Sequence, residues 1–101
     1  MSRTVVRYRV KPEHADDNAE LVRGVYEELK ALDPPGFRYV TFQLEDGVTF
    51  VHVAFADSDP PPLPGLAAFK RFQEGIAERC DEPPVAMKAT EVGSFGFEGA
   101  T

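Results

Sequence analysis

The 101-residue chain contains no tryptophan, a single cysteine, Cys80, and two histidines, His14 and His52. One cysteine excludes an internal disulfide and provides none of the Cys/His spacings that bind zinc. We expect Cys80 to be a small buried hydrophobic residue and not a reactive thiol. Glycine-rich nucleotide-binding motifs and a nucleophile elbow are also missing. The sequence therefore predicts neither a metal site nor a bound cofactor.

Basic residues and long apolar runs are also scarce. Eleven Lys and Arg stand against 17 Asp and Glu, which gives a net charge of −6 and argues against a nucleic-acid partner. No apolar run approaches the about 20 residues of a membrane-spanning helix, and the N-terminal residues lack the apolar core of a secretory signal. We therefore expect a cytoplasmic protein without a membrane partner, folded as one domain over residues 1–101 with residues 98–101 frayed.

The first half of the chain reads as a strand, a helix and a hairpin. Residues 4–11 alternate between apolar and polar side chains, as a strand does, and Pro12 suits the first turn of a helix. The residues DPPG at 33–36 end a predicted helix. Its apolar stripe at helical spacing consists of Val22, Val25, Tyr26, Leu29 and Leu32. Residues 37–44 and 48–55 alternate again around Glu45-Asp46-Gly47, a tight-turn signal that predicts a β-hairpin.

The second half repeats the order helix then strand. The proline-rich residues 56–65 predict a stiff loop without regular structure. A second amphipathic helix is predicted from one more stripe at helical spacing: Leu66, Phe69, Phe72, Ile76 and Cys80. DEPP at 81–84 ends this helix, and residues 85–97 read as a last strand whose glycines permit a bend.

The resulting order βαββαβ predicts an α+β, ferredoxin-like fold: a four-stranded antiparallel sheet with two helices on one face. We assign the more uniformly apolar side chains to the helix-covered face: Val6, Tyr8, Val10, Val40, Phe42, Leu44, Val51, Val53 and Phe55. The other face then carries aromatic and polar side chains together: Arg7, Arg9, Tyr39, Thr41, Gln43, Phe50 and His52. We expect a second copy of the chain to cover this mixed face through a two-fold axis, with a small-molecule cavity between the copies.

His52, in the middle of the apolar residues FVHVAF at 50–55, is the candidate catalytic residue. Near neutral pH it could act as a general base or donate a hydrogen bond to a phenolic ligand. Arg7 and Arg9 could hold a carboxylate or enolate oxygen. We expect the other polar and aromatic side chains of this face to line the ligand: Tyr39, Thr41, Gln43 and Phe50. The alternatives stay open: a structural histidine at the dimer interface, and arginines that form ion pairs across it with Glu91 or another acid.

The element order, the length, the strand FVHVAF and the helix LAAFKRFQ resemble the dimeric α+β barrel proteins, in particular antibiotic-biosynthesis-monooxygenase-like domains. The resemblance implies a homodimer with one pocket per subunit, between sheet and helices or inside the barrel. It also implies a small apolar or aromatic ligand. This chain departs from the oxygenases of that group, because it lacks the tryptophan of their Asn-Trp-Arg constellation. Residues 67–79, AAFKRFQEGIAER, also lack the histidines that many members carry there.

Three functions follow from this sequence. The first is an enzyme, monooxygenase-like or proton-transferring, that binds an aromatic or quinone-like molecule near His52 without a cofactor. The second is a non-catalytic dimeric binding module whose barrel is filled by side chains. The third is an RNA-recognition domain, which shares the element order, although its aromatic signature and basic charge are both missing.

Overall fold

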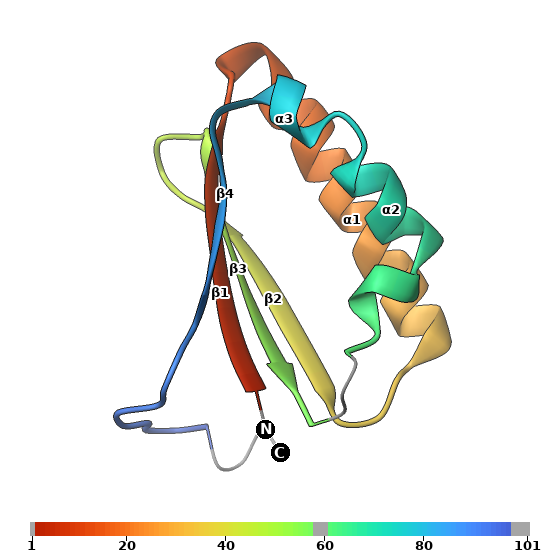
Figure 1. Cartoon of the computed structure of the whole chain (residues 1–101), viewed down its shortest axis with the longest axis vertical. Helices are drawn as coiled ribbons and strands as arrows, with labels where there is room; N and C mark the ends of the chain where they lie inside the picture. Colours follow the sequence, from red (N-terminus) through yellow and green to blue (C-terminus); the bar gives the residue numbers. More distant parts are fainter. Residues whose placement is uncertain (1, 58–60, 98–101) are drawn as a thin grey trace.

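A computed structural model describes residues 2–57 and 61–97 of the chain. Its four strands form one antiparallel sheet in the order β2-β3-β1-β4, and all helices lie on the same face of that sheet (Figure 1). The strands are β1 (Ser2–Val10), β2 (Phe37–Gln43), β3 (Thr49–Ala56) and β4 (Cys80–Lys88). The helices are α1 (Ala15–Leu32), α2 (Ala67–Gln73) and α3 (Ile76–Arg79), with 3₁₀ turns at Pro12–His14 and Leu63–Gly65. The predicted ferredoxin-like α+β fold is confirmed.

The first helix begins and ends where the sequence predicts. Pro12 opens a 3₁₀ turn that leads into α1, and no backbone hydrogen bond is lost because proline stands where a helix has no donor partner. At the other end Asp33 adopts a left-handed conformation (φ 48°), and its N–H donates to the carbonyl of Leu29 at 2.7 Å. The two prolines that follow cannot continue the helix.

The hairpin between β2 and β3 is fixed by its turn residues. The Asp46 carboxylate accepts hydrogen bonds from the backbone N–H groups of Val48 and Thr49, both at 2.9 Å. These bonds, with one from the Thr49 hydroxyl, lower the pKa of Asp46 to about 2. Gly47 supplies the positive φ of 78° that the turn requires. The predicted hairpin is confirmed.

The single helix predicted over residues 66–80 is wrong. The chain breaks at Gly75, which has a φ of 71°, and this break separates α2 from the short α3. Cys80 is not on a helix but is the buried first residue of β4, where burial raises the pKa of its thiol. The apolar spacing continues through the break, which is why periodicity alone missed it.

The last strand is also shifted from its predicted position. It spans Cys80–Lys88 instead of residues 85–97, so that the DEPP segment lies within the strand and not in a loop before it. The register with β1 shifts between Arg7 and Arg9, which accommodates the two prolines at this sheet edge. Residues 89–97 leave the sheet on the side away from the helices (Figure 1). The predictions for residues 98–101, and for 58–60 within the proline-rich loop, lie outside the described residues.

The predicted faces of β2 and β3 are reversed in the structure. Tyr8 pairs with Phe50, and His52 pairs with both Val6 and Thr41, so these side chains share one face. That face packs against the helices, and Phe50 and Tyr8 are among the fully buried side chains of the core. The side chains predicted to face the helices from β2 and β3 point the other way: Val40, Phe42, Val51, Val53 and Phe55. Leu44, from the same predicted set, follows β2 and is exposed.

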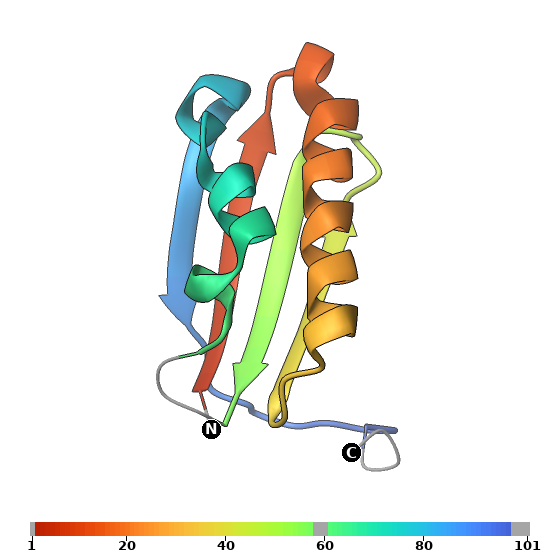
Figure 2. The same ribbon diagram turned by 90° about the vertical axis from the view of Figure 1, so that its right-hand side faces the viewer.

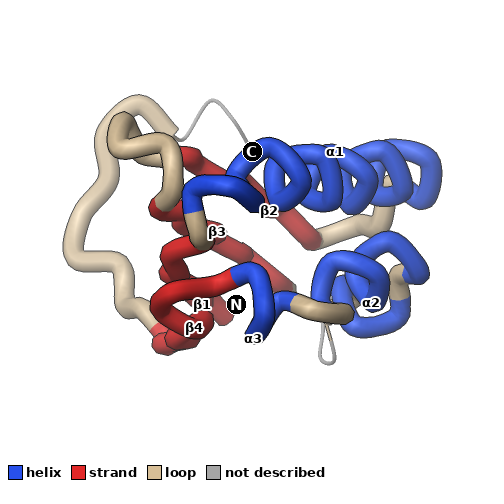
Figure 3. The backbone as a smooth tube through the Cα atoms, turned by 90° about the horizontal axis from the view of Figure 1, so that it is seen from above, coloured by secondary structure: helices blue, strands red, loops and turns tan. Residues whose placement is uncertain are grey.

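The helices α1 and α2 cover the inner face of the sheet and supply most of the helical side chains of the core. Figure 2 shows α1 and α2 side by side in front of the sheet, and Figure 3 shows the same two layers from above. Val22, Val25 and Leu29 of α1 and Phe72 of α2 fill the core against the sheet.

Among the described residues, no helix is long and apolar enough to cross a membrane.

Candidate functional site

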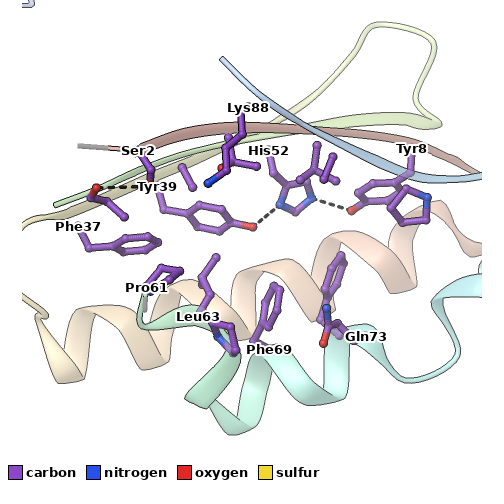
Figure 4. Close-up of a pocket in the computed structure, with 18 of the residues that line it drawn as sticks. Ser2, Tyr8, Phe37, Tyr39, His52, Pro61, Leu63, Phe69, Gln73 and Lys88 are labelled. Atoms are coloured by element: carbon purple, nitrogen blue, oxygen red, sulfur yellow. Dashed lines mark hydrogen bonds between the residues drawn. The ribbon is translucent and has the colours of Figure 1, made fainter. Parts of the chain in front are cut away.

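A cavity of about 920 Å³ lies between the inner face of the sheet and the segment that carries α2. Aromatic and aliphatic side chains dominate its walls, and Figure 4 shows several of them around His52: Phe37, Tyr39, Leu63 and Phe69. Asp57 and Lys88 are exposed residues that line it, so they place one charge of each sign at its opening. The size suits a small organic molecule.

Side-chain size along the strands creates the space. At one end of the inner face Tyr8 lies opposite Phe50, and their rings stack with centroids 5.6 Å apart. Four residues earlier along β1, Thr4 lies opposite Ala54, and the next inward pair joins Ser2 with Ala56. These small side chains cannot reach α2, so they form the floor of the cavity. His52 stands at the boundary between the packed and open ends.

His52 is 4% exposed and has partners at both ring nitrogens. The Tyr8 hydroxyl lies 2.8 Å from Nε2, while the Tyr39 hydroxyl lies 2.5 Å and the Thr41 hydroxyl 3.1 Å from Nδ1. Figure 4 shows the imidazole held between Tyr39 and Tyr8. A further hydroxyl, that of Tyr26 on α1, lies 2.7 Å from the Thr41 oxygen. The ring is therefore fixed from both sides.

The hydrogen-bonded cluster continues beyond Tyr8 into the core. The side-chain amide of Asn18 on α1 donates to the Tyr8 hydroxyl at 2.9 Å, and the Arg79 Nε donates to the Asn18 oxygen at 3.3 Å. Arg79 also donates to the backbone carbonyls of Glu74 and Phe72, at 2.8 and 2.5 Å. Asn18 is fully buried and Arg79 is 9% exposed, so a charged group is held inside by hydrogen bonds.

Burial controls the protonation of this cluster. It lowers the pKa of His52 to about 4, because the charged imidazolium is costly away from water. It raises the pKa values of Tyr8 and Tyr39 far above their usual value, in each case chiefly by desolvation. At pH 7 the imidazole is therefore neutral and both phenols keep their protons.

The structure brings together three of the seven predicted site residues. His52, Tyr39 and Thr41 form one hydrogen-bonded group, although on the face that covers the chain's own cavity and not on the predicted outer face. Phe50 lies in the core, 2% exposed, and does not line the cavity. Gln43 is exposed at the end of β2, and its amide donates to the carbonyl of Gly47 at 2.9 Å.

Arg7 and Arg9 lie on the opposite face from His52. Both guanidinium groups approach the carboxylate of Glu82 on β4, at 3.5 and 3.6 Å, and these side chains are about half exposed. The prediction that they share a site with His52 is wrong, because alternate residues of β1 point to opposite faces. Their ion-pair partner is Glu82 of the same chain, and Glu91, named with 'another acid' as a partner across the dimer, pairs with Arg3.

Tyr8, Asn18 and Arg79 were missed as members of the cluster. The sequence does carry a signal for Asn18, because it stands four residues before Val22 on the stripe that α1 buries. A polar residue in an apolar stripe must find a buried partner. Arg79 carries a weaker signal, because its place beside Asn18 depends on the break in the helix at Gly75.

The described residues contain no group of three or more His, Cys, Asp or Glu side chains placed to hold a metal ion. What the site offers is a neutral hydrogen-bonded histidine and phenol beside a mainly apolar cavity. Such an arrangement can orient a flat ligand through one oxygen and stabilise negative charge on that oxygen.

Comparison with solved structures shows the same fold in several proteins. The chain superposes on a structure named "Putative antibiotic biosynthesis monooxygenase from Nitrosomonas europaea" with a TM-score of 0.75 and 20% identity, over 92% of this chain and 100% of the other. A second structure, named "Crystal structure of antibiotic biosynthesis monooxygenase" without a stated organism, gives a TM-score of 0.74 and 18% identity, again over 92% of this chain and 100% of the other. Rv0793 from Mycobacterium tuberculosis gives a TM-score of 0.72 and 15% identity, over 92% of this chain and 96% of the other.

These likenesses define the class of protein by its fold. The resemblance to antibiotic-biosynthesis-monooxygenase-like domains is confirmed at that level, because the matches extend over nearly the whole length of both chains. The sequence itself matches no protein-family model and no curated protein. At 15–20% identity the fold is shared, whereas activity has to be argued from the site.

Proposed function

We propose that this protein is a cytoplasmic homodimer that binds a small aromatic or quinone-like molecule in the cavity between sheet and α2. We further propose that it catalyses proton transfer on that molecule without a bound cofactor. The observation that carries the proposal is the Tyr39–His52 pair, which meets an otherwise mainly apolar cavity of about 920 Å³. A space of this size weighs against the alternative of a barrel filled by side chains.

The proposed chemistry rests on a hydrogen bond to the ligand oxygen. Both nitrogens of His52 are occupied by protein groups, so the direct contact falls to the Tyr39 hydroxyl. As the ligand gives a proton to the carboxylate of Asp57, which lines the cavity, negative charge grows on the ligand oxygen, and the preorganised Tyr39 donor stabilises that charge. His52 then acts through Tyr39, and not as the base that meets the substrate.

Oxygenation of the same ligand is the second candidate function. It is favoured by the names of the Nitrosomonas europaea structure and of the second structure, which both contain "antibiotic biosynthesis monooxygenase". An oxyanion held by Tyr39 would be the electron-rich form of the ligand in that reaction as well. The two candidates share the binding site and differ in whether oxygen is consumed.

The homodimer is proposed from the outer face of the sheet. Large apolar side chains are exposed there on two strands: Val40 and Phe42 on β2, and Val85 and Met87 on β4. Residues 89–97 project on the same side and expose Val92 and Phe95 almost fully. An apolar patch of this extent is typical of a surface that a partner covers, and a second copy related by a two-fold axis presents the same patch.

A ligand screen with one blocking variant tests the proposal. We expect a quinol, a flavonoid-like phenol or an aromatic acid to raise the thermal unfolding temperature of the wild-type protein, with haem included as a further probe. Ala54→Phe puts a ring on the cavity floor and should abolish that shift, whereas Ala54→Ser leaves the space open and should preserve it. The proposal fails if no compound shifts the wild type, or if Ala54→Phe responds equally.

A further inference from the structure

The hydrogen bonds of the buried cluster form a chain in which each group donates to the next, from Arg79 through Asn18, Tyr8 and His52 to Tyr39. We propose that Arg79, Asn18 and Tyr8 hold His52 in the tautomer with its hydrogen on Nδ1, so that the Tyr39 hydroxyl hydrogen points into the cavity. The site then selects ligands that present an acceptor oxygen, such as a carbonyl or an oxyanion. This inference rests on the proposed function, and it makes Arg79, Asn18 and Tyr8 positioning residues.

The direction is set at Arg79. A guanidinium group only donates hydrogen bonds, so the atom of Asn18 that faces it at 3.3 Å must be the amide oxygen. The Asn18 NH₂ group is therefore turned to the Tyr8 hydroxyl, to which it donates at 2.9 Å. The two backbone carbonyls that Arg79 also meets, those of Phe72 and Glu74, keep the guanidinium in this orientation.

The direction then passes through Tyr8. This side chain is 1% exposed, and among the described residues its hydroxyl meets only Asn18 and His52. Because the Asn18 NH₂ group cannot accept, the hydroxyl hydrogen of Tyr8 must go to Nε2 of His52, 2.8 Å away. The opposite arrangement would leave that hydrogen buried without a partner, which costs free energy.

His52 transmits the direction to the cavity. With Nε2 as an acceptor, the neutral ring carries its hydrogen on Nδ1. Nδ1–H then donates to the Tyr39 oxygen at 2.5 Å, and the Thr41 oxygen lies close by at 3.1 Å. The low pKa of His52, about 4, agrees with a ring that stays neutral at pH 7.

Tyr39 is the last group of the chain. Its oxygen accepts from His52 and from the Thr41 hydroxyl, whose hydrogen bond opposes the larger effect of burial on the pKa of Tyr39. Stacking against Phe37 and Tyr26, with ring centroids 5.8 and 5.3 Å apart, holds the phenol in the cavity wall. Its free hydrogen therefore lies at the cavity, where a ligand oxygen can accept it.

The variant Asn18→Asp reverses the chain without changing its shape. The new carboxylate has no hydrogen to donate, and Arg79 beside it keeps it ionised, so in Asn18→Asp this carboxylate accepts from Tyr8. Tyr8 then accepts from His52 Nε2–H, and Tyr39 donates to Nδ1 instead of to a ligand. Nitrogen chemical shifts of the ¹⁵N-labelled imidazole of His52 at pH 7.5 distinguish the two tautomers. His14→Gln, as a common background, removes the only other histidine.

Without ligand, His52 should carry its hydrogen on Nδ1 in the protein with Asn18 and on Nε2 in the Asn18→Asp variant. An Nε2–H tautomer in the Asn18 form overturns the inference whether or not the variant folds, and so does an unchanged tautomer in a folded variant. A second readout is binding of 1-tetralone and of tetralin, which has the same shape but no carbonyl. We expect at least tenfold preference for 1-tetralone in the wild type and its loss in Asn18→Asp.

The outcomes separate the inference from the proposed function. Equal affinity for the two compounds in the wild type overturns the ligand preference, even with the expected tautomer. If neither compound binds and the wider screen is also negative, the proposed function fails while the tautomer result still decides the direction of the chain.

Discussion

The two faces of the sheet are both rich in apolar side chains, but only one is covered by the chain's own helices. On the inner face the apolar side chains surround a polar cluster built on His52 and Tyr8, and small residues leave a cavity beside it. On the outer face Phe42 and Met87 are 53% and 66% exposed, while Arg7 and Arg9 pair with Glu82. The comparison teaches that buried polar side chains among aromatics mark the candidate site, whereas large exposed apolar side chains mark the face that we propose a second copy covers.

The largest effect should come from a charge on the outer face. In Phe42→Glu each subunit of the proposed dimer would bury an unpaired carboxylate, and a buried unpaired charge costs several kcal/mol. We expect the dimer dissociation constant, measured by sedimentation equilibrium, to rise at least about 1,000-fold, which corresponds to about 4 kcal/mol.

Gln43→Glu provides the matched control for this substitution. It adds the same charge to the next residue of β2, at an exposed position, and should leave the dimer intact. A wild-type protein that sediments as a monomer at micromolar concentration would contradict the proposed interface. Equal dissociation by both variants would instead show that net charge, and not the outer face, governs association.

The next effect is a pH dependence that belongs to the inner face. Burial lowers the pKa of His52 from 6.5 to about 4, so between these values the unfolded chain binds a proton that the folded chain does not. The stability from this histidine is therefore complete above about pH 6.5 and is lost as the pH falls to about 4. A shift of this size corresponds to about 3 kcal/mol.

Urea unfolding of wild type and His52→Gln at several pH values between 7.5 and 4 measures this contribution. The difference in free energy of unfolding between the two proteins should shrink by about 3 kcal/mol on acidification. His14→Gln provides the matched control, because His14 lies at a partly exposed site near Asp17 and does not line the cavity. Parallel curves for His52→Gln would show that the histidine is solvated.

The smallest effect should come from Arg7→Ala. Its ion pair with Glu82 is about half exposed, and pairs of this kind contribute less than about 1 kcal/mol. Because Arg7 lies on the opposite face from the cavity, ligand affinity measured by isothermal titration should change less than about twofold. A loss of tenfold or more would restore the original hypothesis that this arginine holds a ligand oxygen.

The sequence predicted the fold and most of its elements but assigned the faces of two strands wrongly. Turn residues at 33–36 and 45–47 and the alternation of β1 were sufficient for the ferredoxin-like order. The faces of β2 and β3 were not determined, because Val40 and Phe42 on one side are as apolar as the side chains of a core. The pairing of Tyr8 with Phe50 places Phe50 on the face that meets the helices. This register cannot be predicted from the sequence of one strand alone.

The candidate site was predicted in part for the same reason. His52, Tyr39 and Thr41 share a face by simple alternation, so their grouping was predicted correctly even though the face was not. Arg79 lies 61 positions from Asn18 along the chain, and their contact depends on the helix break at Gly75. Such a long-range contact has no local pattern in the sequence.

The most direct test of the account is the infrared carbonyl stretch of 1-tetralone bound to the wild-type protein and to Tyr39→Phe. If Tyr39 donates its hydrogen to the ligand, the wild-type complex should show the stretch at lower frequency than 1-tetralone in hexane. Tyr39→Phe should return the band towards the hexane value, while Tyr26→Phe, on the far side of Thr41, should not. An unshifted carbonyl in the wild-type complex, or no binding at millimolar concentration, would contradict the central claim.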